Sequence, residues 1–176
     1  LRNSLLLAIA PTATIASIAG CYECIEPQVS NLFKRETLSG EFLRVNRYLV
    51  EDLRALGLWT DETRARLRDA DGSVQAIGEL PAGVRRLYRT AWELSQKTLI
   101  DLAAARGPFI DQSQSLNLFM ESPTLEALSS MYMYAWKRGL KTTYYLRSRP
   151  ATRIAKTTRA VAACSLEHPA TCDACQ

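Results

Sequence analysis

The feature that most constrains the fold is an alternation of apolar runs with helical segments, each ended by glycine or proline. Leu5 to Ala10 is a short continuous apolar run that stops at Pro11, which is typical of a strand buried on both faces. Thr12 to Gly20 is rich in small residues and predicts a short helix. Strands that alternate with helices favour an α/β fold, with an inner parallel sheet and helices outside.

Four further helices are predicted from caps, periodicity and stop signals. The first begins near Ser39 and ends at Gly57, with an apolar face of Phe42, Val45, Leu49, Leu53 and Leu56. Thr60 caps a shorter, charged helix that ends near the Asp71-Gly72 turn. A long helix runs from Pro81 to Gly107, with a stripe of Val84, Leu87, Tyr88, Ala91, Leu94, Thr98 and Leu102. The last is capped by Ser122, opens at Pro123 and ends at Gly139, with a stripe of Leu125, Leu128, Met131, Tyr132 and Ala135.

Two extended segments and a tail complete the pattern. Residues 109–120 are predicted to be extended, and the adjacent Tyr144 and Tyr145 open a final strand. Because the apolar periodicity fades after Pro150, we expect a folded part over residues 1–155 and a flexible tail over residues 156–176. The 176 residues suit one domain, and no apolar run reaches the roughly 18 residues that span a bilayer.

The basic residues are unevenly placed, although the net charge is only +4. Between Lys137 and Arg159 there are eight basic residues and no acidic one, and the two tyrosines lie inside this strip. Such a strip suits nucleic acid, phosphate or an acidic partner, and it is equally compatible with a solvated flank. Neighbouring side chains on a strand point to opposite faces, so spacing alone predicts one tyrosine ring in the core and the other at the surface.

The sequence Pro11-Thr12-Ala13-Thr14 lies between the predicted first strand and the predicted first helix. Free backbone N–H groups and the helix dipole make such a turn a seat for an anion, and the hydroxyls of Thr12 and Thr14 add donors. The same sequence also suits an ordinary helix start that binds nothing.

The five cysteines allow three interpretations. Cys21 and Cys24, with Cys172 and Cys175, would form a four-thiolate zinc site if the chain ends met. A local zinc knuckle would use Cys164, His168, Cys172 and Cys175. The third interpretation is a redox pair, because a C-x-x-C motif in a flexible tail can exchange disulfides. The odd number of cysteines argues against a secreted disulfide framework.

Several long segments resemble one enzyme family in the same order along the chain. They are LRNSLLLAIAPTAT, IEPQVSNLFKRETLSGEF, LYRTAWELSQKTLIDLAAARGPFIDQSQSLNLFM, WKRGLKTTYYLRSRPA and CSLEHPATCDACQ. Together they resemble the C-terminal part of the large, catalytic subunit of class I ribonucleotide reductase, in its eukaryote-like branch. The resemblance implies reduction of ribonucleoside diphosphates to deoxyribonucleoside diphosphates. It also implies a ten-stranded α/β barrel with outer helices, of which this chain supplies the last portion.

The resemblance implies roles for eight residues. Tyr144 and Tyr145 match the pair that relays a radical from the small subunit towards an active-site cysteine, and Cys172 and Cys175 match the thiol shuttle recharged by thioredoxin or glutaredoxin. The loop that holds the substrate diphosphate maps to Thr12, Ala13, Thr14 and Ile15. Ile15 departs from the expected hydroxyl residue, so its contact must come from its backbone N–H. No family role carries over to Cys21 and Cys24.

The resemblance also implies what lies elsewhere. The radical cysteine and the ATP and dNTP effector sites are expected upstream of residue 1, and the dinuclear metal centre in the small (beta) subunit. This chain is expected to bind no cofactor or metal, to have no nucleic-acid or membrane partner, and to be cytoplasmic. Alone it should be poorly stable and inactive, because a partial barrel leaves open strand edges. The alternative is a small zinc-stabilised module whose basic strip binds an acidic partner. If the family assignment is right, the tyrosine rings should be close together and a pocket should lie beside Pro11.

Overall fold

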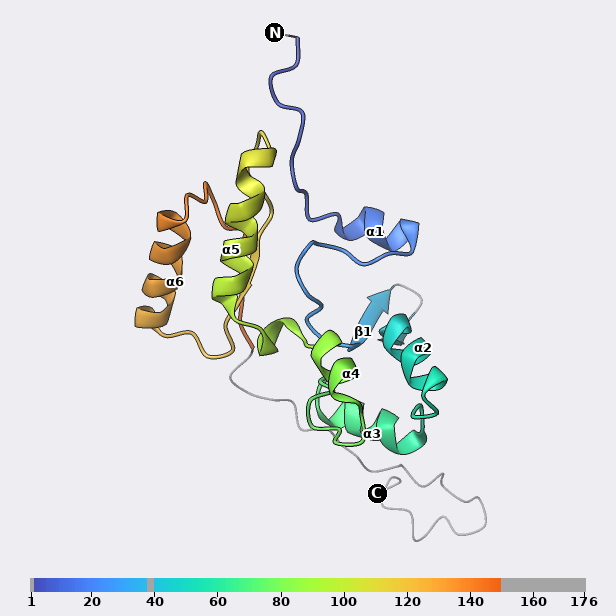
Figure 1. Ribbon diagram of the computed structural model, residues 1–176. Helices are drawn as coiled ribbons and strands as arrows, with labels where there is room; N and C mark the ends of the chain where they lie inside the picture. Colours follow the sequence, from blue (N-terminus) through green and yellow to red (C-terminus); the bar gives the residue numbers. More distant parts are fainter. Residues whose placement is uncertain (1, 38–39, 150–176) are drawn as a thin grey trace, which may run out of the picture.

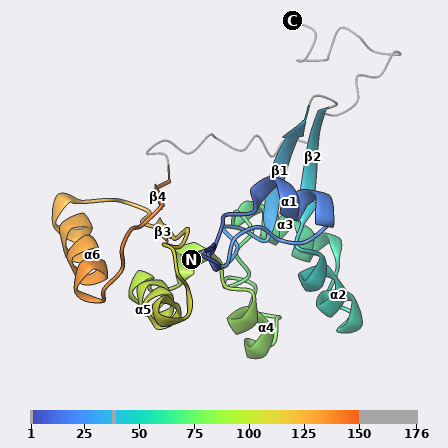
Figure 2. The same cartoon turned by 90° about the horizontal axis from the view of Figure 1, so that it is seen from above.

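The computed structural model describes residues 2–37 and 40–149 as two groups of elements on either side of the N-terminal segment (Figures 1 and 2). The helices are α1 (Ala13–Ala19), α2 (Arg47–Ala55), α3 (Asp61–Asp69), α4 (Ala82–Leu87), α5 (Gln96–Arg106) and α6 (Leu125–Lys137), with 3-10 turns at Ala91–Glu93 and Gly107–Phe109. The strands are β1 (Leu32–Thr37), β2 (Gly40–Val45), β3 (Asn117–Phe119) and β4 (Tyr145–Arg147). The predicted tail, residues 156–176, lies outside the described residues.

One group has the predicted α/β organisation. Strands β3 and β4 pair in parallel, with Asn117 opposite Tyr145, and α6 connects them. Helices α5 and α6 lie side by side next to these strands (Figure 2). Their shared core buries Ile100, Ala103, Leu116, Leu118, Met131 and Ala135. Because parallel strands need a crossover connection, α6 both joins the strands and covers their apolar side chains.

The N-terminal segment extends this sheet, but it is not the buried strand that was predicted. Ile9 forms a parallel bridge with Gln114, and the carbonyl of Leu7 accepts hydrogen bonds from the backbone of Asp111 and Gln112. The Asp111 carboxylate accepts from the N–H groups of Leu6 and Leu7 at 2.8 and 2.9 Å. The side chains of Leu5, Leu6 and Leu7 are nevertheless 57–73% exposed. The prediction of burial was wrong for this chain because the described residues place no layer over them.

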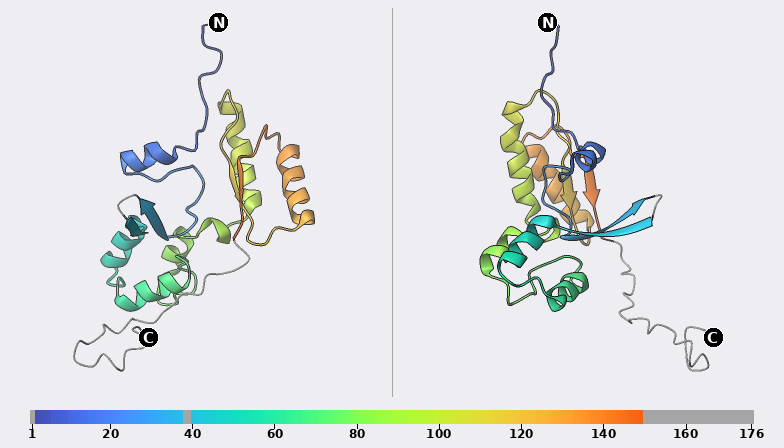
Figure 3. Two further views of the ribbon diagram at one scale, coloured as in Figure 1. Left: turned by 180° about the vertical axis from the view of Figure 1, so that it is seen from behind. Right: turned by 90° about the vertical axis from the view of Figure 1, so that its right-hand side faces the viewer.

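The second group consists of a hairpin and three helices, and here the predicted helix start was wrong. Strands β1 and β2 pair antiparallel from Leu32 opposite Val45 to Thr37 opposite Gly40, and α2 begins only after Asn46, which caps the Tyr48 N–H (Figure 3). Val45 and Leu49 suit helical spacing, but Val45 ends a strand and packs on the same core as Leu49 and Leu53. Gly57 ends the helical segment as predicted, with a φ of 69°. Helix α3 matches its prediction, with Thr60 as its cap.

The long helix predicted from Pro81 to Gly107 is interrupted. Helix α4 ends at Leu87, and α5 starts only after Ser95. Between them the Glu93 carboxylate accepts from the Thr90 N–H at 2.8 Å, so these residues form a new start in place of a continuing helix. Leu87 and Leu102, assigned to the apolar stripe, are 70% and 52% exposed, whereas Tyr88 and Ala91 are buried. The break rotates the second half out of phase with the first.

Helix α6 starts two residues later than predicted, at Leu125, because Thr124 rather than Ser122 caps it by accepting from the Ala127 N–H. It ends before Gly139, whose φ is 80°. Met131 and Ala135 are buried as expected, but Leu125 and Tyr132 are exposed. Among residues 2–37 and 40–149, no helix is long and apolar enough to cross a membrane.

Candidate functional site

The Pro11 turn connects the segment that bridges to Gln114 through Ile9 with helix α1, so the predicted helix follows the turn but no regular strand precedes it. Thr12 is the N-terminal cap residue of α1 and takes a left-handed conformation with a φ of 54°; its side chain makes no capping hydrogen bond. Ala13, Thr14 and Ile15 form the first turn of α1, where backbone N–H groups have no intrahelical acceptor. All four predicted residues are exposed, and buried Ala16 anchors the helix behind them. The turn therefore presents donors to solvent.

The adjacent tyrosines lie in contact. The ring centroids of Tyr144 and Tyr145 are 4.2 Å apart with the planes at 65°, and the rings are 51% and 49% exposed. The simple strand interpretation, with one ring in the core, was wrong. Strand β4 starts only at Tyr145, so Tyr144 does not follow strand alternation, although its N–H donates to the Leu116 carbonyl at 2.8 Å. The expectation of close rings is confirmed.

Charge and hydrogen bonding around the pair favour the protonated phenol. A hydrogen bond to Tyr145, the charge of that neighbour and partial burial raise the pKa of Tyr144, while Arg147 acts in the opposite direction. The Arg147 guanidinium carbon lies 4.6 Å from the centroid of the Tyr145 ring, a cation–π contact. A phenol that stays protonated at neutral pH must lose a proton together with an electron if it is oxidised.

A polar cluster between the turn and the tyrosines was missed by sequence reasoning. Cys24 contacts the Pro11 carbonyl through its N–H at 3.2 Å and its thiol at 3.6 Å. Asn117 donates its side-chain amide to the Cys24 sulfur at 3.7 Å and to Glu26 at 3.2 Å. Glu26 also accepts the backbone N–H of Asn117 at 3.0 Å. The partners are more than 90 residues apart, and the only local signal was a C-x-x-C motif without an assigned role.

Within this cluster the thiol is a poor nucleophile. Burial, followed by the negative charges of Glu26 and Glu23, raises the pKa of Cys24; Arg147 and the Asn117 hydrogen bond oppose the shift. Cys24 also has a left-handed backbone, with a φ of 64°. Its C-x-x-C partner Cys21 is exposed at the end of α1, where its N–H donates to Ala16. The thiol of Cys24 therefore remains a hydrogen-bond donor at neutral pH.

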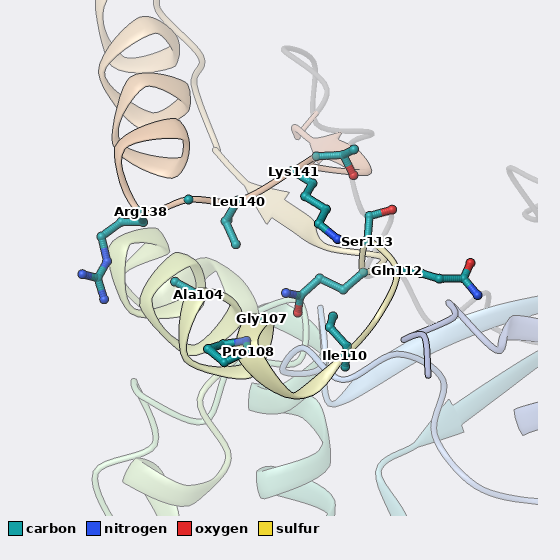
Figure 4. Close-up of a pocket in the computed structure, with 12 residues that line it drawn as sticks. Ala104, Gly107, Pro108, Ile110, Gln112, Ser113, Arg138, Leu140 and Lys141 are labelled. Atoms are coloured by element: carbon teal, nitrogen blue, oxygen red, sulfur yellow. The ribbon is translucent and has the colours of Figure 1, made fainter. Parts of the chain in front are cut away.

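A cavity near the carboxyl ends of α5 and α6 lies away from the Pro11 turn. A space of about 260 Å³ opens between the carboxyl ends of α5 and α6 and the segment before β3, lined by residues such as Pro108, Ser113, Leu140 and Lys141 (Figure 4). Lys141 donates to the Asp111 carbonyl at 3.2 Å there. A second space, about 400 Å³, lies between the hairpin and α3. Neither of these two cavities is lined by Pro11 or by the turn residues 12–15, which are exposed, so the expected pocket beside Pro11 is not one of them.

Four of the predicted thiol and zinc residues belong to the tail. Cys164, His168, Cys172 and Cys175 lie outside the described residues. Within residues 2–37 and 40–149, no three His, Cys, Asp or Glu side chains are grouped so that they could hold a metal ion. The structure therefore groups the turn residues in one place and the two tyrosines in another. Cys24, Glu26 and Asn117 lie between these two groups.

Comparison with known proteins places this geometry in a family. Residues 1–146 match the family model of the ribonucleotide reductase barrel domain. The chain is 54% identical over 152 residues to the ribonucleoside-diphosphate reductase large subunit of Dictyostelium discoideum and 54% identical over 159 residues to that of Trypanosoma brucei brucei. These matches cover 86% and 90% of the chain but only 18% and 19% of the relatives.

A solved structure supports the same assignment. The Actinobacillus ureae class Id ribonucleotide reductase alpha subunit superposes with a TM-score of 0.74 at 32% identity, over 85% of this chain and 27% of that one. The chain thus spans about a fifth of the length of the curated relatives that it matches. From the family model, the identities and the shared α/β fold, this chain belongs to the ribonucleotide reductase large-subunit family, within its barrel domain.

Proposed function

We propose that this chain is the C-terminal portion of a ribonucleoside-diphosphate reductase large subunit. In this role it contributes a diphosphate-binding turn, a tyrosine radical relay and a thiol shuttle. The contact between the rings of Tyr144 and Tyr145, 4.2 Å between centroids, is the observation that carries the proposal. The family membership of residues 1–146 supports it independently. The ten-stranded barrel and the boundary at residue 155 belong to the same proposal.

The relay step is an exchange of one hydrogen atom between two phenols. The O–H bond of one tyrosine breaks as the O–H bond of the other forms, so the radical moves and the protons balance. Close, fixed rings favour this exchange because the reacting oxygens need no diffusion. Arg147 over the Tyr145 ring disfavours a cationic intermediate, which supports the proton and electron leaving together.

The proposed substrate contact is anion binding at the Pro11 turn. Thr12 and Thr14 add hydroxyl donors to the backbone N–H groups at the start of α1, and Ile15 offers its N–H alone. The turn is exposed in this chain, so the remaining walls of a substrate pocket would come from the rest of the subunit. The radical cysteine, the effector sites and the partner's dinuclear metal centre are likewise proposed to lie outside this chain.

Replacing either tyrosine by phenylalanine tests the proposal. In a large subunit carrying this chain, Tyr144→Phe or Tyr145→Phe should lower turnover at least about a thousandfold while substrate affinity and folding stay unchanged, because phenylalanine has no O–H to exchange. Tyr48→Phe is the matched control: Tyr48 is 46% exposed, carries Arg47 4.7 Å from its ring and lies 5.9 Å from the Tyr22 ring. Normal turnover in either relay variant would refute the proposal.

A further inference from the structure

The Cys24 cluster, defined as Cys24, Glu26 and Asn117, lies between the proposed diphosphate turn and the proposed relay. Ile9 forms a parallel bridge with Gln114, and Asn117 pairs with Tyr145. Continued along the three neighbouring segments, this register places Pro11, Asn117 and Tyr145 at about the same height along the strand direction. The cluster therefore bridges two sites that are far apart in the sequence but adjacent across the sheet.

On the turn side, Cys24 holds the residue at which the first segment leaves the sheet. The Pro11 carbonyl accepts from both the N–H and the thiol of Cys24, at 3.2 and 3.6 Å. The left-handed φ of 64° at Cys24 lets the N–H and the side chain point to the same oxygen. Cys24, which follows α1 in the sequence, thereby holds Pro11, which precedes α1, in place.

On the strand side, Glu26 binds Asn117 at the edge of β3, just beyond the point where the N-terminal segment leaves that edge. Pro11 has no N–H and breaks that segment, so the next position along the edge of β3 needs another partner. The Glu26 carboxylate fills this position by accepting the backbone and side-chain N–H groups of Asn117. Residue 117 is in turn opposite Tyr145 in the β3–β4 register.

Asn117 is an unusual choice if stability alone were at stake. It is 4% exposed, and among the described residues its side-chain oxygen is buried without a hydrogen-bond partner. An unpaired buried acceptor is destabilising, and an apolar side chain of similar size would avoid it. What asparagine supplies and leucine does not is the amide N–H that contacts both Cys24 and Glu26.

We propose that Cys24 and Asn117 are positioning residues that hold the diphosphate turn and the Tyr145 strand in one fixed arrangement, so that disturbing one site disturbs the other. The inference rests on the proposed function and gives Cys24 a role in it. Cys21 has no part in the contact, so the C-x-x-C motif acts here through one of its two thiols.

Steady-state kinetics of a large subunit carrying this chain test the inference. Cys24→Ala should raise KM for a ribonucleoside diphosphate about three- to fivefold, the effect of one weak hydrogen bond lost in the bound state, with little change in kcat. Cys24→Ser should restore KM to within about twofold, since a hydroxyl keeps the donor and the acceptor. Cys21→Ser, in the same motif, should leave both constants unchanged.

Asn117→Ala should both raise KM and lower kcat, because it releases the turn and the tyrosine strand together. Asn31→Ala is its control: Asn31 is 3% exposed and donates to the carbonyls of Gly72 and Tyr88, away from both sites. Asn31→Ala should lower thermal stability but leave both KM and kcat of the folded enzyme unchanged. Adding Cys24→Ala to Asn117→Ala should give a KM increase smaller than the product of the two single effects.

Three outcomes would overturn the inference: a Cys24→Ala variant with wild-type constants, a serine variant no better than alanine, or Asn117→Ala with kinetics like those of Asn31→Ala. Should Asn117→Ala fail to fold, the Cys24 series decides alone. If Tyr145→Phe retains turnover, the proposed function fails instead, so the two failures are distinguishable.

Discussion

Replacing glycine by alanine should destabilise the fold by different amounts at two positions, Gly72 in the turn after α3 and Gly57 after α2. Gly72 has a φ of 84°, and a Cβ at this position would lie 2.0 Å from Ser30 Oγ, 2.7 Å from Leu32 N and 2.8 Å from Asn31 N. Gly57 has a similar φ of 69°, and nothing lies within 4 Å of its Cβ position. Comparing Gly72→Ala with Gly57→Ala therefore separates the cost of crowding from the cost of the backbone conformation.

The magnitudes follow from the contacts. A left-handed alanine costs roughly 1–2 kcal/mol, and its lower entropy in the unfolded chain returns about 0.4–1 kcal/mol, so Gly57→Ala should destabilise by about 1.6 kcal/mol at most. Gly72→Ala must also move Ser30, whose hydroxyl can donate its one hydrogen to the carbonyl of Leu32 or of Asp71, at 2.6 and 2.7 Å, and accepts the Leu32 N–H at 3.0 Å. The donated and the accepted bond, at about 1 kcal/mol each, and a forced backbone shift of about 1–3 kcal/mol bring the extra cost to about 3–5 kcal/mol.

Hydrogen exchange in a large subunit carrying this chain measures the difference. Amides near the buried side chains of Leu53 and Leu67 report local opening of the core shared by α2 and α3. Gly72→Ala should lower their opening free energy well below that of Gly57→Ala. If the two variants differ by less than about 1 kcal/mol, the close approach of residues 30–32 to Gly72 is not a tight constraint, and the reasoning fails.

Three further predictions concern the tail, α6 and the first segment. Replacing both Cys172 and Cys175 by serine should preserve turnover with a small dithiol but impair it with thioredoxin; equal loss with both reductants would exclude the shuttle. We expect the small subunit to dock on α6, whose Leu125 and Trp136 are 86% and 69% exposed, and charge reversal at Lys137 and Arg138 should weaken that affinity at low salt; unchanged affinity would exclude an electrostatic contribution. Hydrogen bonds from the backbone N–H groups of Leu6 and Leu7 lower the pKa of Asp111 below its ordinary value, so the contribution of this carboxylate to holding residues 6–7 should be fully present above that ordinary value and lost as pH falls through the lowered pKa. Amide shifts of Leu6 and Leu7 should titrate accordingly in the wild type and not in Asp111→Asn; titration in both would assign the effect to another group.

Local signals predicted the elements whose causes lie within a few residues. Thr60 caps α3, Gly57 and Gly139 adopt the left-handed conformations that end helical segments, and the Pro11 turn leads into α1. Each of these depends on side chains or backbone angles adjacent in the sequence. The α/β organisation followed because strand and helix patterns alternate, and a parallel pair with a crossover helix was then expected.

The predictions from sequence failed where contacts between residues distant in the sequence determine the structure. The spacing of Phe42, Val45 and Leu49 suits a helix, but Leu32 to Thr37 pairs with Gly40 to Val45 and fixes that stretch as a hairpin. The hydrogen bonds of Glu26 and Cys24 to Asn117 join residues more than 90 positions apart, so no window of sequence contains both partners. The contact between the tyrosine rings required the start of β4 to be known to a single residue.

The sheet order has a consequence for how the chain is made. Residues 7–9 bind residues 111–115, and β3 then binds β4, so segments from the start, middle and end of the described chain form one ladder. During synthesis the Pro11 turn leaves the ribosome about 100 residues before its partners, which at roughly 5–20 residues per second is a wait of about 5–20 s. Over that interval the hairpin and α2–α4 can complete their own core, whereas the turn and its cluster can only assemble late.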